Sequence, residues 1–228
     1  AYDNEGLYVL DVSDPGNPIE ITNFNTPSAP QDIVLNENVA YVSDQDDNGP
    51  NYADLAAFVV LDISDPTDIQ QIGYWTGGEE YAWTNTILFR EDIVYLADEN
   101  GVIIADVSDP ANPIDIGYWG GGICENIALS DCGEYLFVAK YGGGLKILDV
   151  TDPTDPYVVG GYNTAGESYG VAIRNEIVYV ADGDAGLYII QHDLEETNCD
   201  SGYVEIGGEL YWETDISILQ QFIDNSQE

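Results

Sequence analysis

The stretch Gly144-Leu-Lys-Ile-Leu-Asp-Val-Thr-Asp-Pro153 decides the fold, because near copies of it recur along the chain. The copies occupy residues 6–15, 58–66 and 101–110, and a fifth stretch over 186–192 starts in the same way and then departs. In each complete copy, a short apolar run ends at an Asp and is followed by Ser/Thr-Asp-Pro. Proline has no backbone amide to donate, so this tripeptide must form a turn and not a sheet ladder. Each copy therefore predicts one strand followed by a turn.

The motif has a regular period. Its second aspartate recurs after 51, 44 and 43 residues, at Asp14, Asp65, Asp109 and Asp152. A period of roughly 20 to 50 residues is typical of architectures built from one repeated supersecondary unit. The unit is therefore close to 43 residues long, with an insertion over 45–56 in its first interval.

Each repeat reads as four short strands separated by turn residues. In the third copy we expect strands C, D, A and B, lettered by their order inside a blade, over 102–107, 114–119, 125–129 and 134–140. The A strands, such as Ile127-Ala-Leu129, are continuously apolar rather than alternating. That pattern is typical of a strand covered on both faces, as the inner strand of a propeller blade is. The sequence therefore predicts an all-β fold, a β-propeller of four-stranded antiparallel blades, over 1–194.

The number of strands leaves two ring closures open. The repeats contain four A/B pairs, five C strands and four D strands, and Ala1-Tyr2-Asp3 aligns with the end of a B strand, Leu96-Ala-Asp98. Either the first C/D pair completes the last A/B pair and closes a small ring, or upstream blades make a larger ring of about four to eight blades. We favour the larger ring, because the fifth C strand is redundant in a four-blade closure.

Residues 195–228 have a different composition from the repeats. We expect a hairpin over 203–212 followed by an amphipathic helix, since Ile216, Leu219, Phe222 and Ile223 fall on one helical face. This segment is expected to be a linker or the start of a further module. The chain begins at Ala1 and contains no methionine, which favours a processed product or a fragment of a larger multidomain protein.

The charge balance restricts the partners. The chain has 4 Lys and Arg against 43 Asp and Glu, a net charge of −39 at pH 7. Phosphate binding is driven by lysine and arginine, so nucleic acid is excluded as a partner, and an anionic membrane surface is disfavoured for the same reason. No hydrophobic run reaches the roughly 20 residues of a membrane span. We interpret the carboxylates chiefly as a solubilising coat suited to a salty medium.

The chain has three cysteines, Cys124, Cys132 and Cys199, so at least one thiol stays free or pairs outside the chain. Cys124 and Cys132 are expected at opposite ends of one strand, about 20 Å apart and beyond disulfide reach. A bond from Cys199 to either of them is left open.

The repeat resembles the LVIVD-repeat β-propellers of bacterial and archaeal cell surfaces. The resemblance rests on Leu-Tyr-Val-Leu-Asp11, Val-Val-Leu-Asp62, Leu-Lys-Ile-Leu-Asp149 and the Ser/Thr-Asp-Pro that follows, and it covers residues 2 to about 192. It implies a propeller displayed outside the cell, and it supplies no catalytic residues. The segment from Cys199 onward is similar to the stretch that precedes leucine-rich repeats in some marine bacterial surface proteins.

One loop matches a calcium-binding spacing. Asp44-Gln-Asp46-Asp47-Asn48-Gly49 fits D-x-[DN]-x-[DN]-G, which lets alternate side-chain oxygens converge on Ca²⁺ around a sharp glycine turn. The twelfth position is Leu55 where an EF-hand has Glu, and Asp54 is a candidate late ligand. The predicted calcium ligands are Asp44, Asp46, Asn48 and Asp54, and the alternative is an ordinary polar loop.

An aspartate recurs once per repeat at the end of the apolar run, at Asp11, Asp62, Asp106 and Asp149. Carboxylates that are buried need hydrogen-bond donors, and the adjacent turn offers backbone amides. We therefore expect these four side chains to be buried and structural.

The residues at the start of the inner strands are the predicted ligand site, because they ring the channel mouth of a propeller. Alignment of the A strands puts Gln31, Asn85, Glu125 and Tyr169 at one level, and Pro30, Thr84, Cys124 and Ser168 one step earlier. Unlike polar residues at one repeat position suit a binding site. Trp75, Trp83 and Trp119 are expected to serve blade packing rather than sugar stacking.

Catalysis has little support in the sequence. The single histidine, His192, stands where the last repeat decays, and we interpret it as a tail or packing residue. We expect an extracellular or cell-surface binding and scaffold module, stabilised by calcium, that recognises a protein or a glycan. The alternative is a carbohydrate-active hydrolase that uses acidic residues near Glu125.

Overall fold

The computed structural model describes residues 6–26, 29–45, 58–76 and 84–194, together with the backbone of 203–206 and 209–212. Three complete four-stranded antiparallel sheets, which we call blades 1 to 3, follow one another along the chain. Blade 1 consists of β3 (Ala29–Asn36), β4 (Val39–Gln45), β5 (Phe58–Asp62) and β6 (Gln70–Trp75). Blade 2 consists of β7 (Thr84–Arg90), β8 (Ile93–Asp98), β9 (Gly101–Asp106) and β10 (Ile114–Trp119). Blade 3 consists of β11 (Cys124–Leu129), β12 (Tyr135–Lys140), β13 (Gly144–Asp149) and β14 (Tyr157–Tyr162).

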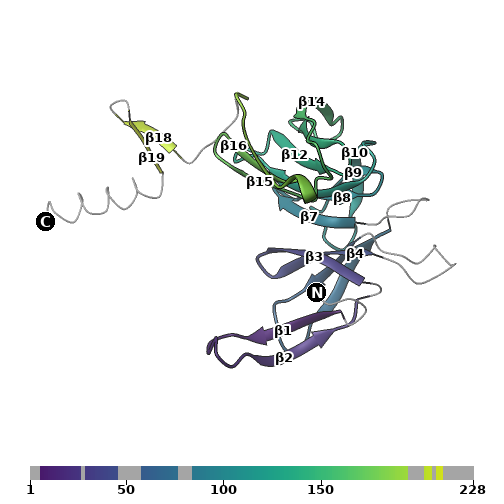
Figure 1. Ribbon diagram of the computed structural model, residues 1–228. Helices are drawn as coiled ribbons and strands as arrows, with labels where there is room; N and C mark the ends of the chain where they lie inside the picture. The colour runs from purple at the N-terminus through teal and green to yellow at the C-terminus, as the bar shows by residue number, and fades with distance from the viewer. Residues whose placement is uncertain are drawn as a thin grey trace, which may run out of the picture.

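Two partial sheets flank these blades (Figure 1). The first sheet pairs β1 (Leu7–Asp11) with β2 (Ile19–Phe24), and the last sheet contains β15 (Gly170–Arg174), β16 (Ile177–Ala181) and β17 (Leu187–Gln191). The predicted β-propeller blades are therefore confirmed, with strand bounds within one or two residues of expectation. One sequence repeat spans two sheets, because its C and D strands complete one blade and its A and B strands open the next.

The strand pairing of the last sheet tests the small-ring closure, which was one of the two closures left open by the sequence. β16 pairs with β17, which stands in the C position, while β1 pairs with β2 in a separate sheet. The first C/D pair therefore does not complete the last A/B pair in this structure. The predicted C-terminal hairpin is present as β18 (Tyr203–Ile206) and β19 (Glu209–Trp212), and the predicted helix lies outside the described residues.

The repeated turn is built from two successive aspartate caps. Asp106 Oδ1 accepts the Ser108 amide at 2.8 Å, and Asp109 Oδ1 accepts the Ala111 amide at 3.1 Å. The same pair of bonds recurs in the other copies of the motif. The predicted donors are thus confirmed, but the predicted burial is wrong: Asp11 is exposed, and Asp62, Asp106 and Asp149 are half-buried. The side chains lie at the sheet rim, where the strand turns away from the core, and the second carboxylate oxygen of Asp149 accepts a further hydrogen bond from the Tyr157 hydroxyl at 3.0 Å.

The hydrophobic core lies between consecutive sheets in four clusters. Each cluster joins the forward face of one sheet, which points toward the next sheet along the chain, to the backward face of that next sheet. In one cluster, Phe137 and Leu145 of blade 3 pack against Val178 and Val180 of the last sheet. The two middle strands of each inner blade are covered on both faces, so most of their residues are apolar.

Glycine in the outer strands lets neighbouring sheets approach. A Cβ at Gly117 of β10 would lie 1.9 Å from the Pro153 carbonyl oxygen of blade 3, and one at Gly73 of β6 would lie 2.1 Å from that of Pro110 in blade 2. The turn of each following blade therefore packs directly on the backbone of the preceding outer strand.

No helix in the described part of the chain has the length and apolar character needed to cross a bilayer.

Candidate functional site

The inner strands carry a side-chain ladder that fixes how their ends meet. Each inner strand of blades 1 to 3 has a β-bulge near its start. Asp32 Oδ2 of β3 accepts the Ile87 amide of β7 at 3.1 Å, and Asn126 Oδ1 of β11 accepts the Val171 amide of β15 at 3.1 Å. Between them, the Asn126 amide donates to Thr86 Oγ1 at 3.1 Å. Each bond links a side chain of one sheet to the next sheet, so the predicted mouth is held in register by polar contacts.

The four predicted mouth residues lie at equivalent positions near the starts of the inner strands, but they make different contacts. Asn85 is half-buried and donates to the Cys124 carbonyl at 3.1 Å, which brings it to the start of β11 beside Glu125. Gln31 is exposed and bonds within its own strand, to the Ala29 carbonyl at 3.2 Å. Tyr169 is 49% exposed and lies just before β15. The structure therefore joins Asn85 of blade 2 to the start of β11 in blade 3, next to Glu125, and leaves Gln31 bonded within its own strand.

Tyr169 belongs to a cluster that the alignment did not predict. Its hydroxyl donates to Glu167 at 2.8 Å, and its ring meets that of Tyr141 edge-on, with ring centroids 5.8 Å apart and an interplanar angle of 73°. The hydrogen bond to Glu167 raises the pKa of Tyr169 to about 12. Hydrogen bonding to Glu167 also raises the pKa of Tyr141. In return, the two tyrosines lower the pKa of the Glu167 carboxyl, which is therefore held as a carboxylate.

Glu125 adds a second carboxylate to this cluster. Burial raises the pKa of Glu125, and the nearby charge of Glu99 raises it further. The charge of Glu125 also contributes to the raised pKa of Tyr141, which places these groups in one electrostatic neighbourhood. Within the described residues, Glu99, Glu125 and Glu167 form no ion pair with lysine or arginine. We call Glu99, Glu125, Tyr141, Glu167 and Tyr169 the acidic tyrosine cluster.

The residues one step before the mouth are buried and structural. Thr84, Cys124 and Ser168 have 0% exposed surface, and Pro30 is buried as well. Three of them pair with a residue near the end of a B strand, Pro30 with Asp44, Thr84 with Asp98 and Cys124 with Lys140. Ser168 contacts Asp182, which directly follows β16. The three aspartates are 0 to 2% exposed. This column of buried aspartates was missed in the sequence, because Lys140 interrupts it and Asp44 had been assigned to the calcium loop.

Asp182 shows what this column does. It accepts hydrogen bonds from Ser168 Oγ at 2.6 Å, from the Gly166 amide at 2.7 Å and from Thr164 Oγ1. Burial by itself raises the pKa of Asp182, but the bonds from Ser168, Thr164 and Gly166 outweigh it and lower the pKa below the usual value of 3.8. The carboxylate thus orders the segment that carries Glu167 and Tyr169.

In blade 3, Cys124 and Lys140 occupy the positions that Ser168 and Asp182 occupy in the last sheet. Cys124 is a free, buried thiol, and burial raises its pKa to about 12, so it is neutral and unreactive. Cys132 is disulfide-bonded, which confirms that Cys124 and Cys132 do not pair with each other. Cys199 lies outside the described residues.

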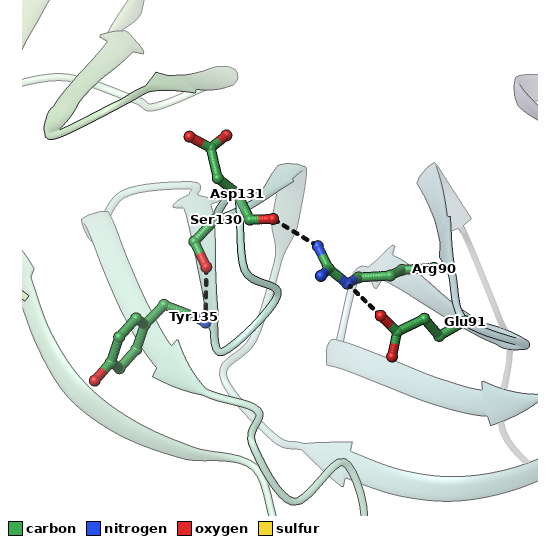
Figure 2. A network of polar contacts seen from close by, with 5 residues as sticks. All are labelled: Arg90, Glu91, Ser130, Asp131 and Tyr135. Atoms are coloured by element: carbon green, nitrogen blue, oxygen red, sulfur yellow. Dashed lines mark hydrogen bonds and ion pairs between the residues drawn. The ribbon is translucent and has the colours of Figure 1, made fainter. Parts of the chain in front are cut away.

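A second inter-blade contact lies at the opposite end of the inner strands (Figure 2). Arg90, the last residue of β7, donates to the Asp131 carbonyl of blade 3 at 2.8 Å and pairs with Glu91 at 3.4 Å. In the same loop, Ser130 Oγ accepts the Tyr135 amide at 3.1 Å. Blades 2 and 3 are therefore tied at both ends, and the acidic tyrosine cluster sits on a fixed support.

The other sequence candidates can now be placed. Trp75 stacks on Phe58, with ring centroids 6.1 Å apart, and Trp119 packs against a core cluster, so both serve blade packing as predicted. The ring of His192 packs against that of Phe137, with ring centroids 5.3 Å apart, in agreement with a packing role. Trp83 and the predicted calcium ligands Asp46, Asn48 and Asp54 lie outside the described residues. Asp44 is buried at the end of β4, and no group of three or more metal-ligating side chains gathers elsewhere in the described residues.

Known proteins share this architecture. The computationally designed protein Ika4 aligns with a TM-score of 0.57 and 14% identity over 73% of this chain and 93% of its own. The designed protein Ika8 gives 0.56 and 15% over 75% of this chain and 49% of its own. A functionally unknown protein from Desulfotomaculum acetoxidans DSM 771 gives 0.65 and 15% over 93% of this chain and 63% of its own. The chain thus spans less than two thirds of the last two, and identities this low show the fold alone.

No curated protein matches this chain. The family model of the LVIVD repeat matches residues 1–26, 29–75, 84–118, 121–164 and 165–191, so its matches cover every blade and end with β17. The chain belongs to the LVIVD repeat family.

Proposed function

We propose that this chain is a secreted or cell-surface binding module that holds a cationic group of a partner at the acidic tyrosine cluster. The observation that carries the proposal is the arrangement around Glu167: two tyrosine rings fixed by one carboxylate, beside the half-buried Glu125. Carboxylates and aromatic faces together bind ammonium groups. Such groups occur on basic segments of proteins and on amino sugars of glycans, and both kinds of partner fit the cluster.

The electrostatics of the cluster support this choice. Burial and the neighbouring Glu99 charge both disfavour the ionised form of Glu125. A bound cation would relieve the repulsion between these carboxylates and would therefore favour the ionised form of Glu125. The net charge of −39 would also steer a cationic partner toward the molecule at low ionic strength.

Cysteine usage supports the proposed extracellular location. Cys132 is disulfide-bonded, and disulfides persist in oxidising surroundings such as the cell surface. This supports the extracellular location that the resemblance to surface propellers implies. We also propose that Ca²⁺ braces the loop that follows Asp44. Calorimetric titration with CaCl₂ against MgCl₂ at equal ionic strength tests this, and absence of heat with calcium contradicts it.

A binding experiment tests the main proposal. An oligolysine peptide and a chitosan oligomer serve as cationic probes, with oligoglutamate and fully acetylated chitin oligomer as matched controls. We expect both cationic probes to bind, and the Glu125→Gln variant to bind roughly tenfold more weakly through loss of one charge-assisted contact. Asp115→Asn, an exposed change on β10, should leave affinity unaltered. Equal affinity of Glu125→Gln and the parent chain would contradict the assignment, as would failure of both cationic probes to bind.

The pH dependence gives a second readout. Because the pKa of Glu125 is raised above 4.5, its charge is lost at a higher pH than that of an ordinary glutamate. Probe binding should therefore weaken as the pH falls through this raised value, and it should do so less in Glu125→Gln. An affinity that is flat with pH down to the usual glutamate range would argue against Glu125 as a contact.

A hydrolase is the second candidate, favoured by the same raised pKa of Glu125, which suits a general acid beside another carboxylate such as Glu99. Release of reducing ends from a bound glycan, abolished in Glu125→Gln, would establish it. Glycan binding without release of reducing ends would favour the binding module over the hydrolase.

A further inference from the structure

The C strands alternate between the two faces of their sheets in one fixed order. In blade 3, Leu145 and Ile147 of β13 point forward and are 1% and 8% exposed. They are covered by Val171, Val178 and Val180 of the last sheet. The same order holds for β1, β5 and β9, whose forward residues join the clusters with the following blades.

The last sheet repeats this forward face without a cover. Gly186-Leu-Tyr-Ile aligns with Gly144-Leu-Lys-Ile, so Leu187 and Ile189 stand where Leu145 and Ile147 stand in blade 3. Leu187 is 62% exposed and Ile189 is 64% exposed. The apolar face that every earlier sheet buries is therefore open to solvent on β17.

The first sheet has the opposite face open. Tyr8 and Leu10 of β1 align with Tyr188 and Ile190 of β17, which pack backward onto the cluster of blade 3. On β1 these positions are 43% and 48% exposed. Figure 1 shows the two sheets at opposite ends of the array. The open forward face and the open backward face are thus the two halves of one repeated interface, and among the described residues they do not cover each other.

We propose that a second copy of this chain supplies the missing cover: the forward face of the last sheet, with Leu187 and Ile189, packs on the backward face of the first sheet of another copy, with Tyr8 and Leu10. The contact continues the blade-to-blade interface that the chain already uses four times. It is heterologous, so successive copies form a ring if the rotation closes and an open chain of copies if it does not.

The charge of the chain sets the conditions for this contact. Two copies that each carry −39 repel one another, and the repulsion is screened as salt is added. The Debye length falls to about 3 Å at 1 M ionic strength. Association should therefore be weak in dilute buffer and strengthen with salt, as expected for an apolar contact between acidic molecules.

Sedimentation velocity over a series of protein concentrations in high salt tests the proposal. The parent chain should associate with increasing concentration. The forward variant, Leu187→Asp with Ile189→Asp, and the backward variant, Tyr8→Asp with Leu10→Asp, should each remain monomeric. All four side chains are exposed, so both variants should keep the melting temperature of the monomer. Ile114→Asp, an equally exposed change on the outer strand β10, is the matched control and should associate like the parent.

Mixing the two variants distinguishes this contact from a symmetric one. The forward variant keeps an intact backward face, and the backward variant keeps an intact forward face, so an equimolar mixture should form a heterodimer that stops there. A parent chain that stays monomeric at all concentrations in high salt overturns the proposal. So does a backward variant that associates as well as the parent, because two forward faces would then be pairing with each other.

Discussion

Asp182 accepts hydrogen bonds from Ser168, Gly166 and Thr164, and these donors all lie in the segment between β14 and β15. At this scale the sequence was a good guide to the aspartates of the repeated turn, whose local amide donors follow from the Ser/Thr-Asp-Pro spacing. It was a poor guide to their burial, because exposure depends on where the rim of the sheet lies. It also did not reveal Asp182 or Asp98 as buried, since an isolated Asp after a strand is typical of an ordinary turn.

Asp182→Ala should lower the melting temperature at pH 7 by more than about 4 °C, because three donors lose their acceptor. Asp184→Ala, an exposed change two residues away, is the control and should have little effect. The folded-state pKa of Asp182 lies below 3.8, so its contribution is complete above that pH and is lost as the pH falls through the lowered value. Thermal unfolding should therefore show the difference between Asp182→Ala and the parent shrinking in acid. A difference that grows in acid would contradict the assignment.

The elements of this fold were predictable where their signals are local. Strand order, the proline turns and the apolar inner strands follow from periodicity and from the chemistry of proline and aspartate. The acidic tyrosine cluster was only half predictable. Tyr169 and Glu125 share an alignment column, but Tyr141 and Glu167 come from loops of neighbouring sheets, and only the packing of those sheets brings them together.

Outer-strand glycines offer a test at the element scale. Gly117→Ala should cost about 1–3 kcal/mol or more, because its Cβ would lie 1.9 Å from a backbone carbonyl of the next blade. Gly160 occupies the same position in β14, where a Cβ would make only an ordinary 3.7 Å contact with Ile147. Gly160→Ala should therefore be tolerated. Urea unfolding of the two variants checks the contrast, and equal stabilities would show that the blades do not approach as closely as described.

On the scale of the whole molecule, stability comes from stacking one kind of sheet on the next. Each interface buries apolar side chains that a single sheet leaves exposed, as expected for repeats whose energies depend on nearest neighbours. Within the described residues, the sheets at the two ends of the array have no neighbouring sheet on one face, and this is where exposed apolar residues of the C strands gather.

Leu145 and Leu187 occupy equivalent repeat positions, so their truncation compares the stability that a leucine contributes with and without a covering sheet. Leu145→Ala should destabilise the chain by about 2–5 kcal/mol, because Leu145 is buried against the last sheet. Leu187→Ala should cost at most about 0.5 kcal/mol in dilute buffer, since the side chain is 62% exposed. Chemical unfolding at low protein concentration gives both values. A large cost for Leu187→Ala under these conditions would mean that the last sheet is covered within the monomer.

The sequence by itself determined the repeat, the strands and the turns, because each depends on local spacing. Only the tertiary structure decided which carboxylates are buried, which loops form the acidic tyrosine cluster and which faces stay open. Those properties depend on what lies across an interface, and residues with the same place in the repeat, such as Leu145 and Leu187, differ only in whether a neighbouring sheet covers them.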